Sequence, residues 1–310
     1  MDLDWFEDIN CNICSGYAST TLYPAKYGKL SKDDLVRKYR SSGDETLIDQ
    51  VVKCKRCGLV YINPRLKPEL ILEGYSLGSD ETFVSQSKGR EITFSNALKR
   101  INNLTNHKRG RILDVGTAGG SFLHVAKKDG WDVSGCEPNK WLTEWSEKHY
   151  NLKITPGTIF DGNYKDEYFD VVTLWDVLEH VPNPKLVLLE CNRVLKEDGL
   201  LVINYPDYGS WIAKLMGRRW VFLLSVHLYY FTPKTIKLIL NKTGYNVIKE
   251  SPHFQRLSLD YLVLRIKAYS KILHSVGKLF IKLPGVKKLQ VPYWIGQTLI
   301  VAKKKSKEEQ

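Results

Sequence analysis

Four of the six cysteines form two pairs with the spacing of metal ligands. Cys11 and Cys14 make the first pair, and Cys54 and Cys57 make the second. Two thiolates from one tight turn can bind a single ion, and two such turns complete the tetrahedral four-sulfur site that zinc prefers. The spacing therefore predicts a structural zinc in a zinc-ribbon-like module over residues 1–64. Four unrelated thiols, or a redox-active pair, are the alternatives.

A second informative stretch is a glycine-rich turn that follows an apolar strand, 111–115, and precedes a helix, 121–128. Its pattern is D-x-G-x-A-x-G, which is neither the dinucleotide pattern G-x-G-x-x-G nor a P-loop, and it has no basic residue to hold a phosphate. Such a turn lets a ligand approach the backbone, and the helix N-terminus offers free N–H groups. The residues predicted to contact the ligand here are Asp114, Gly116, Ala118 and Gly120.

Glu137 indicates what that ligand is. It lies 23 residues after Asp114, at the end of the next predicted strand, 131–136. A carboxylate at this place can accept hydrogen bonds from both hydroxyls of a ribose. The two features together predict a nucleoside site, and a glycine-rich turn without a ligand is the alternative.

Two histidines are candidates for acid–base chemistry. In Asp176-Val-Leu-Glu179-His180 the three polar residues would share one helix face and could bind a divalent ion. The alternative is a local cluster at a helix start, without a metal. His227 precedes three aromatic residues and is expected where a substrate enters, as a base or ligand, or as a buried histidine with a structural role.

The elements that position these residues alternate between strand and helix. Further strands are expected at 169–175 and 199–204, with a helix over 184–196. This alternation predicts an α/β fold with a mostly parallel sheet covered on both faces. Because ligands bind beyond the carboxyl ends of such strands, the turn, Glu137 and the histidines are expected on one side of the sheet.

Composition and charge narrow the function further. The 310 residues are 43% apolar and 26% charged, and the net charge is +12, which favours anionic partners. Residues 253–292 hold eight basic residues and one acid, with apolar residues at helical spacing. This insertion is expected either to pack as a basic lid or to make a peripheral membrane contact. The acidic N-terminus and the short apolar runs predict a cytoplasmic protein, with the inner membrane surface as a second location.

Residues 90–303 resemble the class I S-adenosylmethionine-dependent methyltransferases. Asp114–Gly120 matches their first motif, with Ala118 in place of the middle glycine, and Phe169–Pro184 is similar to a motif of the ubiquinone-type O-methyltransferases. The resemblance implies a Rossmann-like, seven-stranded, mostly parallel sheet and S-adenosyl-L-methionine as cofactor. It also implies that Asp161 and Trp175 flank the cofactor. The predicted organisation is a zinc module, a helical connector or cap over 65–106, and a methyltransferase domain over 107–305.

Three functions are consistent with these features. The leading prediction is a methyltransferase that acts on a small anionic acceptor, by resemblance a nucleotide sugar or another glycan precursor. The second is an RNA methyltransferase whose zinc module and basic surface hold nucleic acid. The basic residues lack the interleaved aromatic residues of a base-stacking surface, which disfavours this reading. The third is a scaffold protein with a degenerate cofactor pocket, for which Ala118 is the only support.

Overall fold

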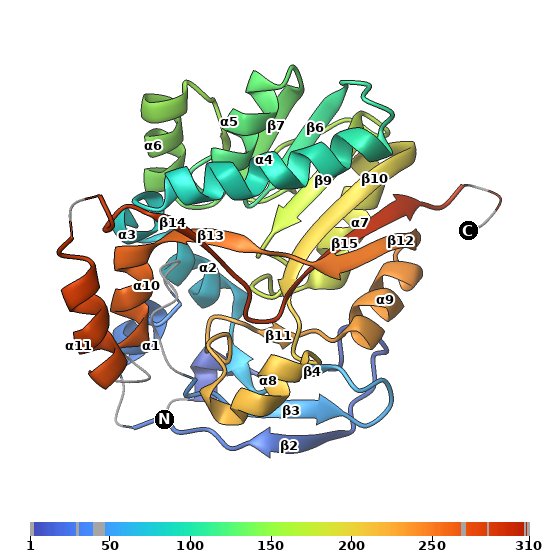
Figure 1. Cartoon of the computed structure of the whole chain (residues 1–310). Helices are drawn as coiled ribbons and strands as arrows, with labels where there is room; N and C mark the ends of the chain where they lie inside the picture. The colour runs from blue at the N-terminus through green and yellow to red at the C-terminus, as the bar shows by residue number, and fades with distance from the viewer. Residues whose placement is uncertain are drawn as a thin grey trace.

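The computed structural model of the chain describes residues 3–28, 31–39, 47–267, 271–283, 285–306 and 308. Its centre, within those residues, is a seven-stranded sheet in which β15 alone runs antiparallel to its neighbours (Figure 1). This confirms the predicted Rossmann-like fold. In their order across the sheet, the strands are β12 (Tyr245–Pro252), β15 (Gln297–Lys304), β10 (Leu195–Pro206), β9 (Phe169–Trp175), β6 (Arg111–Val115), β7 (Asp132–Glu137) and β8 (Thr155–Pro156).

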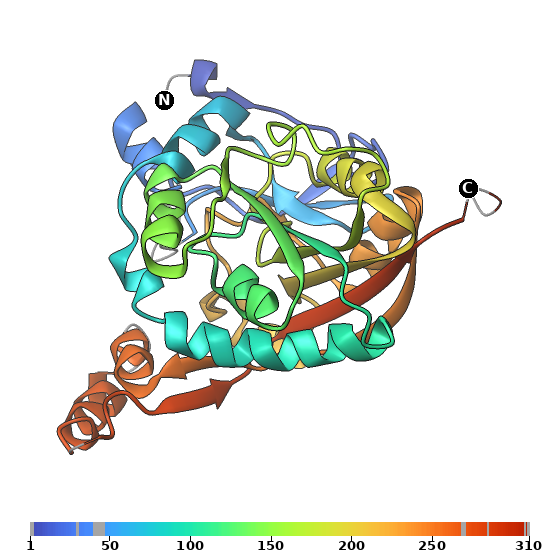
Figure 2. The ribbon, with the colours of Figure 1, turned by 90° about the horizontal axis from the view of Figure 1, so that it is seen from above.

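Helices cover both faces of this sheet because its strands are apolar on both sides. Ile112 and Val171 join the apolar cluster that contains residues of α4 and α5, while their neighbours Leu113 and Val172 join the cluster that contains residues of α7 and α9. Figure 2 shows α4 lying along one side of the sheet. These helices, with α6 beside β7, are α4 (Ser87–Leu104), α5 (Ser121–Lys128), α6 (Lys140–Tyr150), α7 (Pro184–Val194) and α9 (Pro233–Lys242).

The boundary between α7 and β10 differs from the prediction. The helix ends at Val194, and Leu195 already pairs with Phe169 of β9. The pairing then shifts register before Leu200. The expected helix to residue 196 was therefore two residues too long, because strand pairing and full burial of Leu195 outweigh its helix propensity.

The N-terminal part forms its own small sheet and shares it with the C-terminal half of the chain. Within that sheet, Tyr229 of β11 pairs with Tyr61 of β4, although 168 residues separate them. The part is therefore joined to the rest by backbone hydrogen bonds as well as by the connecting chain. Its elements are β11 (Tyr229–Tyr230), β4 (Val60–Ile62), β3 (Val51–Cys54), β2 (Ser19–Tyr23), β1 (Phe6–Glu7), β5 (Arg65–Leu66), α1 (Lys32–Arg37) and the 3-10 turn η1 (Leu3–Trp5).

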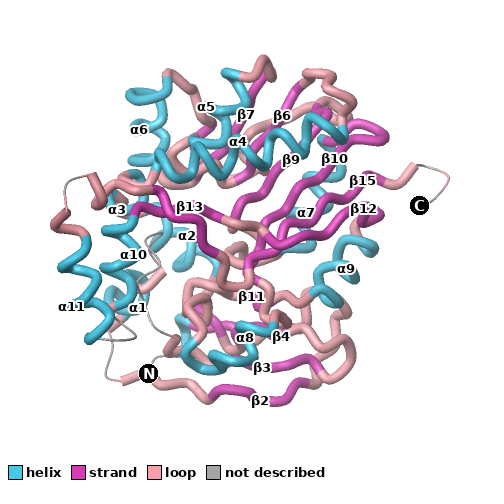
Figure 3. The backbone as a smooth tube through the Cα atoms, in the orientation of Figure 1, coloured by secondary structure: helices cyan, strands magenta, loops and turns pink. Residues whose placement is uncertain are grey.

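Two further segments complete the fold. Between β5 and β6 the chain forms α2 (Pro68–Ser76), α3 (Glu81–Val84) and α4. Between β12 and β15 a hairpin carries two helices, which project from the body of the molecule (Figures 2 and 3). The hairpin and the remaining elements are β13 (Gln255–Ser258), α10 (Leu259–Ile266), α11 (Lys271–Phe280), β14 (Gln290–Tyr293), α8 (Trp211–Met216) and the 3-10 turn η2 (Gly217–Arg219).

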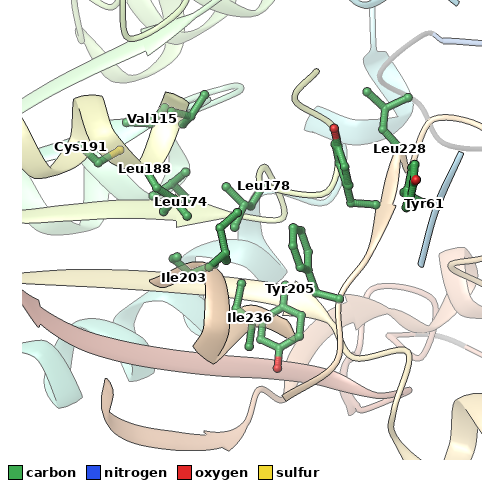
Figure 4. Close-up of a cluster of buried hydrophobic side chains, with 14 of the residues drawn as sticks. Tyr61, Val115, Leu174, Leu178, Leu188, Cys191, Ile203, Tyr205, Leu228 and Ile236 are labelled. Carbon is green, nitrogen blue, oxygen red and sulfur yellow. The ribbon is translucent and has the colours of Figure 1, made fainter. Parts of the chain in front are cut away.

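One apolar cluster runs from the N-terminal part into the main sheet. It includes Tyr61 and Leu228 on one side and Leu178 and Tyr205 on the other (Figure 4). Burying this surface together stabilises both parts at once. In the described part of the chain, we find no helix with the length and apolar character needed to span a bilayer.

Candidate functional site

The glycine-rich turn forms a bare backbone surface at the end of β6. Gly116, Ala118 and Gly120 all have left-handed φ angles, of +66°, +47° and +77°. A Cβ at Gly116 would lie 2.8 Å from the Val177 side chain, so this position requires glycine. The positive φ of Ala118 is a strained conformation for a residue with a Cβ. In this conformation its N–H donates a hydrogen bond of 2.8 Å to the Glu137 carboxylate.

Glu137 is wholly buried and is bound by backbone on both carboxylate oxygens. Oε2 accepts the Ala118 N–H, and Oε1 accepts the Asn139 N–H over 2.9 Å. Burial raises the pKa of Glu137 to about 7, although these N–H groups act in the opposite direction. Each oxygen keeps a second lone pair, so the carboxylate can still accept two more hydrogen bonds. The side chain therefore links the end of β7 to the glycine-rich turn, as the position predicted from sequence requires.

Tyr75 of α2 covers this carboxylate. Its hydroxyl interacts with Glu137, and burial raises the pKa of the phenol well above its ordinary value. A hydroxyl at this place occupies a position where a ribose hydroxyl could also bind Glu137. Tyr75 could not be predicted, because α2 is distant along the chain and only the fold brings it here.

Asp114 and Trp175 lie at the carboxyl ends of neighbouring strands. The buried Asp114 accepts a hydrogen bond of 2.6 Å from Thr173, and burial raises the pKa of Asp114 to about 7. Trp175 packs against both Phe94 and Phe122, with ring centroids 5.1 and 5.0 Å away. Its Nε1–H is buried and has no partner among the described residues. Both side chains line a common cavity with the glycine-rich turn.

Asp161 does not face that cavity. Its exposed carboxylate accepts hydrogen bonds from the N–H and the hydroxyl of Thr158, both at 2.7 Å. These bonds lower the pKa of Asp161 and shape the loop 157–160, which does line the cavity. Asp161 therefore supports this loop, and its predicted place beside the cofactor stays a prediction.

The cavity has a volume of about 1090 Å³. Single small-molecule sites measure roughly 300–1,000 Å³, so this space can hold a nucleoside and a second molecule together. Its lining includes the glycine-rich turn, the loop 157–160, His180 and His227. Residues of helix α10 also line the cavity, and so does Tyr39 from the N-terminal part.

The two histidines face each other inside this cavity. Their ring centroids are 4.6 Å apart. The Nδ1 of His180 lies 2.9 Å from the Val226 carbonyl oxygen, and the Nδ1 of His227 lies 2.8 Å from that of Phe222. Since a carbonyl oxygen only accepts, each Nδ1 carries the proton and each Nε2 is free to accept one. Burial lowers the pKa of His180 to about 4 and that of His227 well below its ordinary value, so both rings are neutral near pH 7.

Glu179 completes this group. Candidate ligand atoms of Glu179, His180 and His227 lie within 4.8 Å of one another. The Glu179 carboxyl is buried and neither oxygen has a hydrogen-bond partner among the described residues. Burial, with Asp176 nearby, raises the pKa of Glu179 well above its ordinary value. The group could share a proton or bind a divalent ion.

Asp176 is not part of this group, which corrects the predicted set. The segment 176–180 is a turn and not a helix, because Asp176 has a φ of +52° and Pro182 disfavours a helical residue before it. The Asp176 carboxylate binds Asn204 and Gln255 instead. His227, which comes from a separate segment, takes the place that sequence spacing gave to Asp176.

The four cysteines meet at the predicted metal site. Their sulfurs lie within 4.8 Å of one another, with 3.4 Å between Cys11 and Cys57 and 3.5 Å between Cys14 and Cys54. All four are free thiols. In a tetrahedral zinc site with Zn–S bonds of about 2.3 Å, the sulfurs are roughly 3.8 Å apart, so this arrangement fits the ion.

Comparison with known proteins decides the family. A model described as "Methyltransferase domain" matches residues 90–250, just over half of the chain. The chain belongs to this methyltransferase family. The match covers the glycine-rich turn, Glu137 and both histidines, and it ends just before the hairpin that carries α10 and α11.

Curated relatives of the methyltransferase domain are similar over part of their length. The chain is 26% identical over 147 residues to the ubiquinone biosynthesis O-methyltransferase of Pasteurella multocida, covering 42% of this chain and 60% of that protein. It is 34% identical over 118 residues to the enzyme of that name from Glaesserella parasuis, covering 34% of this chain and 50% of that protein. A SAM-dependent methyltransferase structure from Archaeoglobus fulgidus is 21% identical with a TM-score of 0.49, covering 73% of this chain and all of that one.

Proposed function

We propose that this chain transfers a methyl group from S-adenosylmethionine to a small molecule. The observation that carries the proposal is the single cavity in which the glycine-rich turn and the histidine pair face a common space. A methyl donor and an acceptor must lie in contact for direct displacement, and most of the rate enhancement comes from holding them aligned and excluding water.

The described residues fit the cofactor. Beside the two backbone N–H groups and the Tyr75 hydroxyl, Glu137 keeps acceptor capacity for a ribose hydroxyl, and the left-handed backbone at Gly116 and Gly120 allows close approach. The unpartnered Nε1–H of Trp175 offers a donor in the cavity wall. Asp114 is proposed to support the turn from beneath through its bond to Thr173. When bound, S-adenosylmethionine supplies an electrophilic methyl group on a sulfonium.

His227 is the proposed base if the acceptor atom is a hydroxyl oxygen. Its Nε2 is unprotonated, and its Nδ1–H is held by the Phe222 carbonyl, which fixes the ring. His180 lies against it and keeps a second neutral nitrogen in reach. Because both pKa values lie below their ordinary range, the base stays available from neutral pH into mildly acidic solution.

For the acceptor we propose a small hydroxylated molecule with an anionic group, such as a nucleotide sugar or another glycan precursor. Four basic side chains that line the cavity support this class, Arg90, Arg256, Arg265 and Lys267. Asp80 and Asp176 offset part of this charge. The curated relatives carry names of small-molecule methyltransferases, which is consistent with an acceptor of this size.

A divalent ion is the second candidate for the histidine group, and the orphaned carboxyl of Glu179 favours it. An ion held by Glu179, His180 and His227 would lower the pKa of an acceptor hydroxyl directly. We propose a separate, structural role for zinc at the four cysteines, since four thiolate ligands leave no open coordination position.

The test is a transfer assay with labelled S-adenosylmethionine and pools of small metabolites. His227→Ala should lower kcat by about 10²–10⁴-fold while the Kd for the cofactor stays unchanged. His149→Ala, at an exposed histidine on α6, is the matched control and should keep full turnover. If the His227 variant turns over as fast as the unaltered protein, His227 is not the base. If excess divalent ion restores the activity of a slow His227 variant, the result supports a metal at the histidine group.

A further inference from the structure

The helices α10 and α11 expose an unusual amount of apolar surface. Between residues 264 and 289, eight large apolar side chains are more than 45% exposed, and Ile272 and Leu279 reach 78% and 68%. The eight are Leu264, Ile272, Leu273, Val276, Leu279, Phe280, Leu283 and Leu289. A cluster of this kind on a projecting element marks a binding surface.

The packing of α11 explains which side is left uncovered. It contacts α10 through His274, whose Nδ1 donates to the Val263 carbonyl over 2.8 Å, and through Gly277, where a Cβ would lie 2.8 Å from Val263. At 100° per residue, Ile272, Val276 and Leu279 point away from this contact, and Phe280 lies at the edge of the same side. We call these four residues the apolar face of α11.

Basic residues flank the apolar face. Lys278 is exposed and lies on the helical wheel between the apolar face and the contact with α10, and Lys282 is exposed in the turn that follows the helix. Lys267, Lys287 and Lys288 are exposed in the adjoining turns. The sequence from 259 to 289 contains a single acid, Asp260, so the surface has a strong positive potential.

We propose that the apolar face of α11 docks on the surface of an anionic phospholipid bilayer. Apolar side chains would enter the boundary between headgroups and acyl chains, while the lysines would meet lipid phosphates. The positive charge beside the apolar face favours an anionic bilayer over a second copy of the chain as the binding partner. A two-fold dimer through this face would bring its lysines against their own copies, whereas an anionic lipid surface neutralises them.

This docking would place the bilayer beside the cavity. Tyr261, Leu264 and Lys267 belong to α10 or its end and also line the cavity. Figure 1 shows α10 between α11 and the rest of the molecule. One helix therefore separates the proposed lipid surface from the cavity, and the inference does not depend on which reaction occurs there.

The experiment is flotation of the full-length protein with vesicles of phosphatidylglycerol and phosphatidylcholine, or of phosphatidylcholine alone. Binding is expected only to the anionic vesicles and should weaken as salt is added. Leu279→Ser with Phe280→Ser should lower vesicle affinity by at least about tenfold, and so should Lys278→Glu with Lys282→Glu.

Leu215→Ser on α8, where the side chain is 77% exposed, and Lys128→Glu on α5 are the matched controls and should bind as the unaltered protein does. Thermal melts and sedimentation accompany each variant. Equal binding to neutral vesicles, or no binding to either kind, overturns the proposal. It is also overturned if the unaltered protein sediments as a dimer that the Leu279–Phe280 variant converts to a monomer, since the face would then hold a second copy.

Discussion

Asp114 and Glu137 are buried carboxyl groups at the ends of β6 and β7, and their ionisation is coupled to folding. Burial raises the pKa of each to about 7, well above the value of an unfolded chain. The folded protein therefore binds these protons more tightly than the unfolded chain does. Their contribution to the unfolding free energy is largest in acid and is lost as the pH rises toward 7.

Asp114→Asn tests this coupling. Asparagine keeps an acceptor for Thr173 and removes the ionisation. Relative to the original protein, the variant should gain unfolding free energy as the pH rises from about 4 to 7, by up to about 1.4 kcal/mol per pH unit. Urea denaturation at pH 5 and pH 7.5 measures the gain. Asp33→Asn, at an exposed carboxylate, is the control, and an equal pH dependence in both variants would contradict the burial argument.

Single residues show where sequence reasoning succeeds and fails. The turn and Glu137 could be predicted because both are local consequences of a strand followed by a helix, and the Ala118 N–H links them as the spacing requires. Tyr75 and Gln255 could not, since each comes from a distant segment and only tertiary packing brings it to Glu137 or Asp176. The bond that the Asp161 carboxylate accepts from the Thr158 N–H shows the preference of a carboxylate near a turn for its own backbone.

At the level of elements, Arg65 of β5 joins three separate segments. Its buried guanidinium binds Glu7 at 2.8 Å, the Pro182 carbonyl at 2.7 Å and the Tyr229 hydroxyl at 3.0 Å. Pro182 lies in the turn that follows His180, and Tyr229 lies two residues after His227. Arg65 therefore fixes the two histidine-bearing segments relative to each other.

Arg65→Lys should lower the unfolding free energy by about 1–3 kcal/mol, because an ammonium cannot reproduce the planar set of donors. It should also reduce turnover without changing cofactor affinity. Arg109→Lys is the matched control, since its ion pair with Asp129 is partly exposed and is worth under about 1 kcal/mol. Denaturation and calorimetry measure both quantities. A loss of cofactor affinity equal to the loss of turnover would contradict the assignment of Arg65 to the histidine side.

Apolar periodicity in the sequence predicts the helices and strands, except where tertiary contacts override the local preference. The strands and helices around the glycine-rich turn have strong, local apolar patterns and form as predicted. The segment from Asp176 to His180 has helical spacing but lies before two prolines, and the hydrogen bonds of the Glu179 carbonyl to Leu228 and Tyr229 fix it as a turn. The same contacts bring His227 to Glu179, which no spacing along the chain encodes.

At the scale of the whole molecule, the proposed zinc site should stabilise the N-terminal part and also the segment around His227 that shares its sheet. The strand β3 ends at Cys54, β4 follows Cys57, and β4 pairs with β11 next to His227. Removing the metal is expected to loosen this sheet and to displace the base. Cys54→Ser, or treatment with a strong chelator, should lower the melting temperature and turnover more than it lowers cofactor affinity.

Cys191→Ser is the control for that experiment, because Cys191 is buried but far from the cluster along the chain. Metal analysis of the purified protein should find about one zinc per chain, lost in the Cys54 variant. A protein without zinc that melts and turns over normally would contradict the structural role.

The shared sheet is also the main feature of the whole molecule that sequence did not reveal. Cysteine spacing indicated a separate module, but nothing in a two-residue strand at 229–230 shows that it pairs with residues 60 and 61. Because long-range strand pairing has no local signature, the boundary predicted at residue 64 divides segments that share a sheet.

The proposed function requires a nucleoside site formed by the glycine-rich turn and Glu137. Titration calorimetry of S-adenosylmethionine into the full-length protein and into Glu137→Gln tests it most directly, with Glu144→Gln at an exposed position of α6 as control. We expect one molecule bound per chain, with affinity about 10–100-fold weaker in the Glu137 variant and unchanged in the control. No binding by the folded, unaltered protein at saturating cofactor, or equal affinity in the Glu137 variant, would contradict the account.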